Sequence, residues 1–134
     1  MIHVLYHSDC FDGFGAAWVA DGYFGRGRAQ LIPCKYGEPA PEIKYGDVYI
    51  VDFSFPRADM LRLKQDNSFL KVLDHHKTAQ ANCEGLDFCT FDMERSGAGL
   101  AWDYFYPNKL RPRLINYVED RDLWNFALPM SREV

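Results

Sequence analysis

Short apolar segments that suit β-strands alternate along this sequence with segments that suit helices. The strand candidates are residues 2–6, 29–33, 48–53, 69–73 and 86–91. The helix candidates are residues 14–24, a segment opened by Pro56, a segment N-capped by Ser96 and running to Pro107, and a last segment opened by Pro112. Alternation of this kind favours a mostly parallel sheet with helices on its faces, so the predicted fold class is α/β.

Composition narrows the class of protein further. With 134 residues, 48% of them hydrophobic and 25% charged, the chain predicts one folded domain spanning residues 1–134. A net charge of −4 disfavours a basic surface that coats nucleic acid. The four cysteines form no CxxC pair, no signal peptide precedes them, and no apolar stretch is long enough to span a membrane. We therefore expect a cytoplasmic protein with reduced thiols and no membrane partner.

Three of the strand candidates end in residue types that bind metal ions. The first runs into His7, Ser8 and Asp9, residues 48–51 of the third run into Asp52, and the fourth runs into Asp74, His75 and His76. In open parallel sheets the ligand crevice lies at the carboxyl ends of the strands, so these side chains are expected to converge. Taken singly, Asp9 and the pair Asp12-Gly13 also suit ordinary turns, Asp52 could be an ion-paired structural acid, and one histidine could lie outside the metal contacts.

Carboxylates and imidazoles gathered in a partly buried crevice need a compensating cation. A set of ligands rich in carboxylates favours Mn²⁺ or Mg²⁺, and the number of side chains allows two ions. Two ions about 4 Å apart can clamp a phosphoryl group and generate a hydroxide nucleophile. The residues themselves therefore predict a metal-dependent hydrolase of phosphate esters.

The motifs resemble those of the DHH phosphoesterase family, which includes RecJ-type single-strand exonucleases, nano-RNases, cyclic dinucleotide phosphodiesterases and family II inorganic pyrophosphatases. Asp74-His75-His76 matches the triplet that names the family. Three further blocks follow the family's order: residues 7–13 resemble its first motif, Asp52 the second, and residues 120–124 the fourth. The resemblance spans residues 3–124 and implies a Rossmann-like DHH domain.

The resemblance also implies roles for individual residues. One Mn²⁺ would be held by His7, Asp9 and Asp52, and a second by Asp12, Asp52, His75 and Asp120. The catalytic set would be Asp52, Asp74, His75 and His76, with Asp74 orienting its neighbours and His76 facing the substrate phosphate. The first motif departs from the family pattern, because two residues separate Asp9 from Asp12. Either Asp120 or Asp122 could be the acid of the fourth motif.

Substrate contacts are expected from His76, Lys77, Arg95 and the Ser96-Gly97 helix start, whose N–H groups suit an anion. Arg57 is a further candidate for the phosphate, and Phe53 or Phe55 could stack a base. Family members also carry a C-terminal substrate-binding domain, which we do not expect within this chain. The predicted function is hydrolysis of phosphodiester bonds in single-stranded nucleic acid, short oligonucleotides or cyclic dinucleotides. The alternatives are a metal- or partner-binding lobe with little turnover and a pyrophosphatase-like enzyme. The sequence leaves the oligomeric state open.

Overall fold

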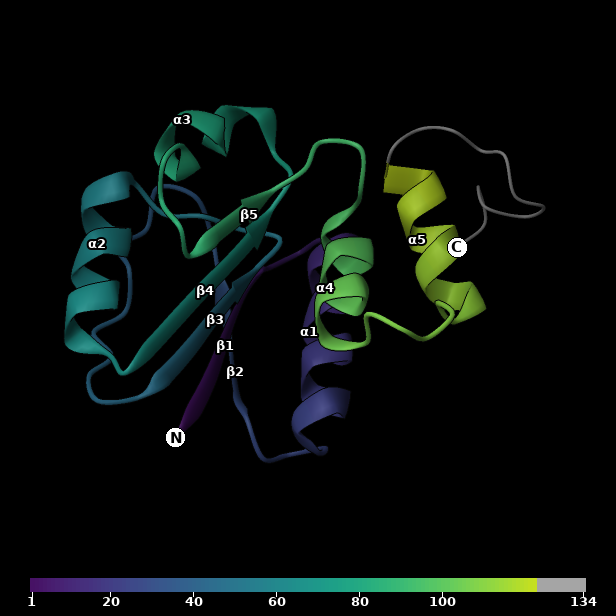
Figure 1. Cartoon of the computed structure of the whole chain (residues 1–134), viewed down its shortest axis with the longest axis horizontal. Helices are drawn as coiled ribbons and strands as arrows, with labels where there is room; N and C mark the ends of the chain where they lie inside the picture. The colour runs from purple at the N-terminus through teal and green to yellow at the C-terminus, as the bar shows by residue number, and fades with distance from the viewer. Residues whose placement is uncertain (123–134) are drawn as a thin grey trace.

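The protein is a three-layer α/β domain built on a five-stranded sheet (Figure 1). The structure, a computed structural model, describes the backbone of residues 1–122 and the side chains of residues 1–119. Its strands are β1 (Ile2–His7), β2 (Gln30–Cys34), β3 (Asp47–Val51), β4 (Phe69–Asp74) and β5 (Cys89–Phe91). Its helices are α1 (Phe11–Phe24), α2 (Arg57–Asp66), the 3₁₀ turn η1 (Lys77–Ala79), α3 (Gln80–Cys83), α4 (Gly97–Phe105) and α5 (Arg113–Asp122).

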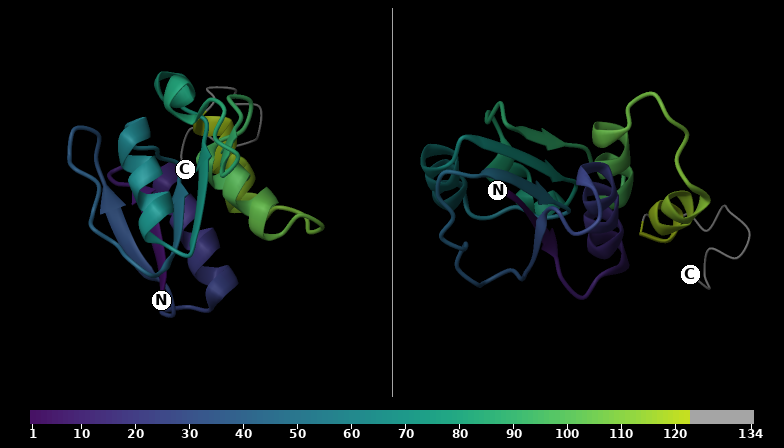
Figure 2. Two further views of the ribbon diagram at one scale, coloured as in Figure 1. Left: turned by 60° about the vertical axis from the view of Figure 1, so that its left-hand side comes forward. Right: turned by 90° about the horizontal axis from the view of Figure 1, so that it is seen from below.

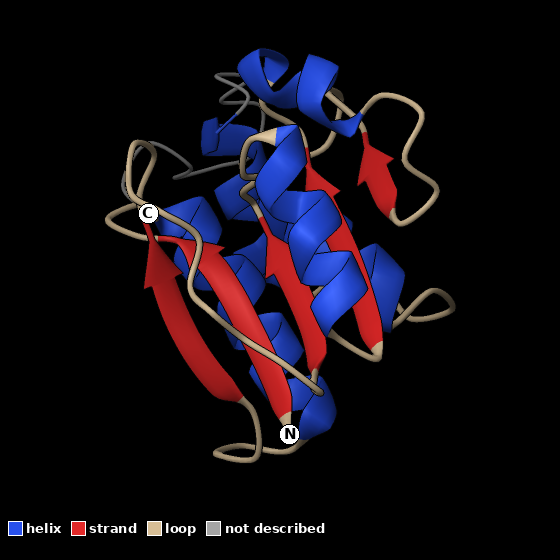
Figure 3. Cartoon of the chain, turned by 90° about the vertical axis from the view of Figure 1, so that its left-hand side faces the viewer, coloured by secondary structure: helices blue, strands red, loops and turns tan. Residues whose placement is uncertain are grey.

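All described strand pairs are parallel, and the strand order is β2-β1-β3-β4-β5 (Figure 3). The α/β prediction is thus confirmed, and the arrangement is Rossmann-like. The chain moves outward from β1 to β2 and then returns to the other side of β1 as β3. This reversal makes the gap between β1 and β3 the switch point of the sheet, where open α/β folds bind ligands.

Alternating residues along the strands send apolar side chains into two separate cores. Leu5, Ile50 and Val72 pack with α2, α3 and the loop after β2 on one face. Their neighbours along the chain, including Val4 and Val51, pack with α1, α4 and α5 on the other. Helix α5 lies outside α1 and α4, as the right-hand view of Figure 2 shows. This period-two alternation is what a sheet covered on both faces requires.

The predictions were wrong at two boundaries that bear on the site or its edge, and they missed two short helices. Helix α1 begins at Phe11 rather than at residue 14, so Asp12 and Gly13 lie in its first turn and not in a loop. A Cβ on Gly13 would lie 2.0 Å from the carbonyl oxygen of His7, so this glycine permits close packing and does not form a turn. The fifth strand shrinks to Cys89–Phe91 because Leu86 and Phe88 pack into the core from a turn, and the short helices η1 and α3 before it were not predicted.

Among the described residues, no helix has both the length and the apolar composition needed to cross a lipid bilayer.

Candidate metal centre

The register of the sheet places three of the predicted ligands in a row. Tyr6 pairs with Val51, and Val51 pairs with Leu73. The next residues along these three strands are His7, Asp52 and Asp74. The backbone N–H of Asp52 continues the ladder by donating to the carbonyl oxygen of Leu73 at 2.8 Å. The carboxyl edge of β1, β3 and β4, on both sides of the switch point, therefore carries the cluster.

Asp52 lies at the centre of this cluster. Its side chain is fully buried, and its backbone adopts a φ of 57°, a conformation that residues other than glycine rarely adopt. Burial acts to raise the pKa of Asp52, but His7, whose Nδ1 lies 3.7 Å from Asp52 Oδ2, and the hydrogen-bonded His75 lower it to about 2. A buried carboxylate that stays ionised in a strained backbone is typical of a functional site rather than of a core.

His75 lies between two carboxylates. Its Nε2 is 2.8 Å from Asp52 Oδ1 and 3.1 Å from Asp12 Oδ2, and only 8% of the side chain is exposed. Burial acts to lower the pKa of His75, but the hydrogen bonds to Asp12 and Asp52 raise it to about 10. Without a metal ion, His75 is therefore an imidazolium that compensates the two buried charges.

Asp74 orients the other histidine. Its Oδ1 accepts the backbone N–H of His75 at 2.8 Å and lies 2.7 Å from His76 Nδ1. This contact leaves His76 Nε2 directed to the rest of the site, 3.8 Å from Asp52 Oδ1. His76 is 28% exposed, so it can meet a ligand from solvent while His75 cannot. His75 is thus the buried member of the pair and His76 the accessible one, and their ligand and substrate-facing roles stay predictions.

The first predicted ligand set needs a correction. Asp9 projects away from the cluster: its side chain is 80% exposed and pairs with Lys35 at 3.2 Å. Cys10 takes the corresponding place, because Cys10, His7 and Asp52 each offer a ligand atom within 4.8 Å of the others. The cause is the early start of α1, which turns Cys10 inward as its N-cap residue. Burial, with a smaller contribution from the charge of Asp52, raises the pKa of the Cys10 thiol.

A second group of ligand atoms, also within 4.8 Å of one another, comes from Asp52, His75 and His76. Asp52 is common to both groups, as the bridging role predicted for it requires. Asp12 adjoins this second group through its contact with His75. The side chains of Asp120 and Asp122 lie outside the described residues, so the fourth-motif acid stays a prediction.

The start of α4 is occupied by carboxylates of the protein and does not offer an anion site. Asp12 accepts the N–H groups of Gly97 at 2.7 Å and Ala98 at 2.8 Å. Glu119 accepts the N–H of Ser96, and the Ser96 hydroxyl caps the helix by accepting from the N–H of Gly99. The N-cap prediction for Ser96 is confirmed, but these contacts contradict its predicted role in binding substrate.

The predicted cationic contacts also differ in availability. Arg95 is paired with Asp92 at 2.8 Å and Asp103 at 3.1 Å, so its charge is already neutralised and its predicted role in binding phosphate is not supported. Arg57 donates to the carbonyl oxygen of Glu84. Lys77 is exposed directly after the histidines and keeps its predicted role as a candidate contact.

Aromatic rings line one side of the cluster, and sequence reasoning missed the most accessible of them. Tyr36 stacks on Phe53 with ring centroids 4.5 Å apart, and its hydroxyl lies 3.4 Å from His76 Nδ1. Tyr36 is half exposed, whereas Phe53 and Phe55 are buried and cannot stack a base as predicted. Nothing in the sequence distinguishes Tyr36, since it lies between the second and third strand candidates. Cys10 was detectable from its position between His7 and Asp12.

The described residues fit a divalent cation on an observation independent of the family resemblance. Asp12, Asp52 and Asp74 are three carboxylates buried within one site. His7 Nδ1 and Asp74 Oδ2 are buried and have no hydrogen-bond partner in the described part of the chain. Buried polar atoms are nearly always paired, so an unpaired imidazole nitrogen and an unpaired carboxylate oxygen favour a bound cation. The nitrogen and oxygen donors suit Mn²⁺, Fe²⁺ or Zn²⁺, and the Cys10 sulfur in the first group favours Zn²⁺ or Fe²⁺ there.

Comparison with known proteins supports the fold, but the similar proteins carry no name that indicates an activity. No family model matches the sequence. The chain is 33% identical over 147 residues to "Uncharacterized protein R106" of Acanthamoeba polyphaga mimivirus, covering 97% of this chain and 35% of that protein. A crystal structure of an uncharacterized protein from Helicobacter pylori G27 matches with a TM-score of 0.75 at 17% identity, over 95% of this chain and 45% of that one. The chain thus spans about a third of the viral relative and under half of the bacterial one.

Proposed function

We propose that this chain is the metal-binding catalytic lobe of a DHH-type phosphoesterase that hydrolyses phosphodiester bonds in short or single-stranded nucleic acid or in cyclic dinucleotides. One observation carries the proposal: three buried carboxylates and three histidines meet at the carboxyl edge of a parallel sheet, with Asp52 common to both groups of ligand atoms. Two divalent cations, Mn²⁺ in the first instance, would be held by His7, Cys10 and Asp52 and by Asp12, Asp52 and His75. Bound cations lower the pKa of water and neutralise phosphate charge.

The protein's own side chains would position the ligands and contact the substrate phosphate. Asp74 accepts the Nδ1–H of His76 and raises the pKa of that ring, which favours the imidazolium form. In this form His76 Nε2 also carries a proton and can donate it to a phosphate oxygen. Asp12 ties the site to α4 by accepting two backbone N–H groups, which fixes its carboxylate beside His75. Lys77 adds positive charge at the solvent side. The two buried ligands, Asp52 and His75, are thereby held in place before a substrate arrives.

Substituting Asp52→Asn or His75→Ala tests this function. Each change removes a ligand from a site whose geometry the rest of the chain holds, so we expect hydrolysis of a short single-stranded oligonucleotide with Mn²⁺ to fall at least a thousandfold. Far-UV circular dichroism should show that both variants stay folded. The matched control is Asp87→Asn, an exposed acid after α3, which should keep full activity. Activity retained in either ligand variant would refute the proposed function.

A second candidate follows from the partial coverage of both relatives. Because the chain matches only 35% and 45% of those proteins, the metal-binding lobe could need another segment to turn over substrate. In that case isothermal titration would show Mn²⁺ binding that Asp52→Asn removes, with no cleavage of the oligonucleotide. Cleavage by this chain alone rules out the second candidate.

A further inference from the structure

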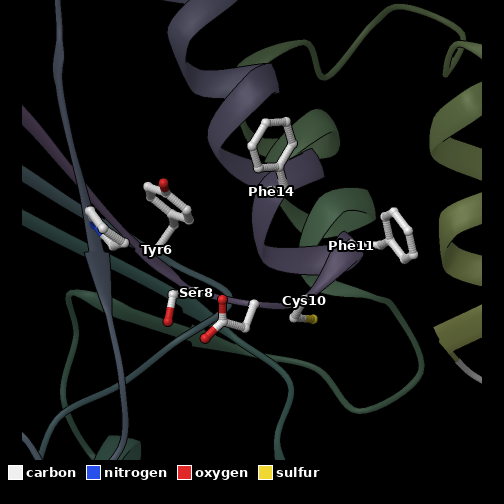
Figure 4. Close-up of a pocket in the computed structure, with 7 residues that line it drawn as sticks. Tyr6, Ser8, Cys10, Phe11 and Phe14 are labelled. Atoms are coloured by element: carbon white, nitrogen blue, oxygen red, sulfur yellow. The ribbon is translucent and has the colours of Figure 1, made fainter.

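A cavity of about 530 Å³ lies next to the candidate metal centre, on the side of β2. It is lined by the end of β1, the first turn of α1 and Pro33 of the edge strand. Figure 4 shows Tyr6 and Phe14 bordering it, with Ser8 and Cys10 in the segment that joins β1 to α1. The volume lies within the range typical of small-molecule sites.

Cys10 links this cavity to the metal centre. Its side chain lines the cavity and also offers the sulfur atom that groups with His7 and Asp52. A molecule in the cavity would therefore lie one side chain away from the candidate ligands. In a nucleotide, the sugar separates the phosphate from the base by a similarly short span, so one nucleotide could reach both sites.

Aromatic and polar groups in the cavity select for one kind of occupant. Phe14 is 67% exposed although it is a large apolar residue, and Tyr6 provides a second ring. The Ser8 hydroxyl is buried without a hydrogen-bond partner in the described part of the chain. Flat apolar rings together with an unpaired hydroxyl suit a planar heterocycle whose edge carries hydrogen-bonding groups.

The negative charge in the cavity disfavours a phosphate there. The charged group that lines the cavity is the carboxylate of Asp9. A carboxylate can accept hydrogen bonds from the N–H groups of a ligand, but it repels a phosphate. Its partner Lys35 is 60% exposed, so this surface pair rearranges at little cost. An anionic group would thus lie at the metal centre, and the uncharged part of the same molecule would enter the cavity.

We propose that this cavity binds the nucleobase of the substrate, with Phe14 as the stacking platform. The inference rests on the proposed function for the location of the phosphate, but base binding itself requires no metal ion. Asp9, expected as a metal ligand, instead becomes a residue that reads the edge of the base.

Adenosine, which has a base but no phosphate, is the probe for this site. In metal-free buffer, adenosine should shift the backbone amide resonances of Tyr6, Ser8, Cys10 and Phe14, while ribose at the same concentration leaves them unchanged. The Phe14→Ala variant removes an exposed ring and should weaken adenosine binding about fivefold to hundredfold. Tyr45→Ala removes a ring that is 88% exposed at the opposite end of the sheet, and it should bind as wild type does.

The outcomes separate this proposal from the proposed function. Absence of adenosine shifts, equal shifts with ribose, or unchanged binding by Phe14→Ala overturns the nucleobase site, even if the protein hydrolyses oligonucleotides with Mn²⁺. Adenosine shifts at the named residues that Phe14→Ala removes support it, even if no hydrolysis is found.

Discussion

At the scale of single residues, the surroundings of Asp52 are unusually tight. Gly97, the first residue of α4, lies against it: a Cβ on Gly97 would be 2.4 Å from both Cβ and Oδ1 of Asp52. Because Asp52 is fully buried in a left-handed conformation, it has no room to withdraw. The Asp52 carboxylate can therefore occupy its position only because Gly97 has no side chain.

We expect Gly97→Ala to lower the free energy of unfolding by about 1–3 kcal/mol, because the new methyl group overpacks the site. It should also weaken Mn²⁺ binding by displacing Asp52. Chemical denaturation and isothermal titration measure the two effects.

Gly22→Ala provides the matched control for this substitution. Gly22 lies inside α1, where an added Cβ meets only the flexible guanidinium of Arg26. Alanine there should stabilise the protein by about 0.5–1 kcal/mol, since glycine is unfavourable within helices. If Gly97→Ala stabilised the protein to the same degree, the inference that Gly97 packs tightly against Asp52 would be refuted.

At the scale of secondary structure, the position of α5 depends on a network of charges. Arg111, just before α5, contacts Asp103 of α4 at 2.7 Å and Glu119 of α5 at 2.7 Å. Glu119 in turn accepts the N–H of Ser96, so the network joins α5 to the start of α4 and to the segment beside Asp52. Only 18% of the Arg111 side chain is exposed, which limits screening by solvent.

The Arg111→Met variant should lose about 1–3 kcal/mol of stability at pH 7, because the partly buried carboxylates of Asp103 and Glu119 each lose one charged partner. Burial acts to raise the pKa of Asp103, but hydrogen bonds from Arg111 and Arg95 hold it below 3.8. A carboxyl group whose pKa is lower in the folded than in the unfolded protein stabilises the folded state above its unfolded pKa, and this stabilisation is lost as the pH falls. The stability difference between Arg111→Met and wild type should therefore shrink below pH 3.8.

Urea denaturation at several pH values measures this effect of Arg111→Met. The control Arg62→Met removes an exposed pair in α2 with a 4.0 Å separation and should change stability by less than about 0.5 kcal/mol. A stability difference for Arg111→Met that grew in acid would contradict the network.

At the scale of the whole molecule, the candidate metal centre joins residues from β1, β3, β4 and α1, so a cation bound there should stabilise the entire domain. A ligand at about 100 times its Kd adds roughly 2.7 kcal/mol, which corresponds to a rise in Tm on the order of 10 °C for a domain of this size. Differential scanning calorimetry with Mn²⁺, Zn²⁺ and EDTA should show this rise with a metal and its loss on chelation.

Two variants separate the ligand set predicted from sequence from the one in the structure. Cys10→Ala should reduce the metal-induced rise in Tm, because its sulfur lies among the ligand atoms. Asp9→Asn should leave the rise unchanged, because Asp9 is exposed and pairs with Lys35. A rise that depended on Asp9 and not on Cys10 would restore the original assignment.

Much of the architecture followed from sequence for a simple reason. Apolar runs with β-branched residues mark strands, parallel strands bring their carboxyl ends to one edge, and residues directly after such runs must lie there. His7, Asp52 and Asp74 were therefore predictable as neighbours. The N-cap of α4 at Ser96 was predictable too, since a local hydroxyl contact to Gly99 forms it.

Tertiary structure decided the features that depend on contacts between distant segments. Asp12 accepts the N–H groups of Gly97 and Ala98, which lie 85 and 86 positions later in the sequence. These N–H groups at the start of α4 are therefore not available to an anion. The packing of Gly97 against Asp52 also joins segments that lie far apart in the sequence. The choice of Cys10 over Asp9 depends on where α1 begins. Sequence determined which residues reach the edge of the sheet, and packing determined which of their atoms remain available, because only packing brings competing partners together.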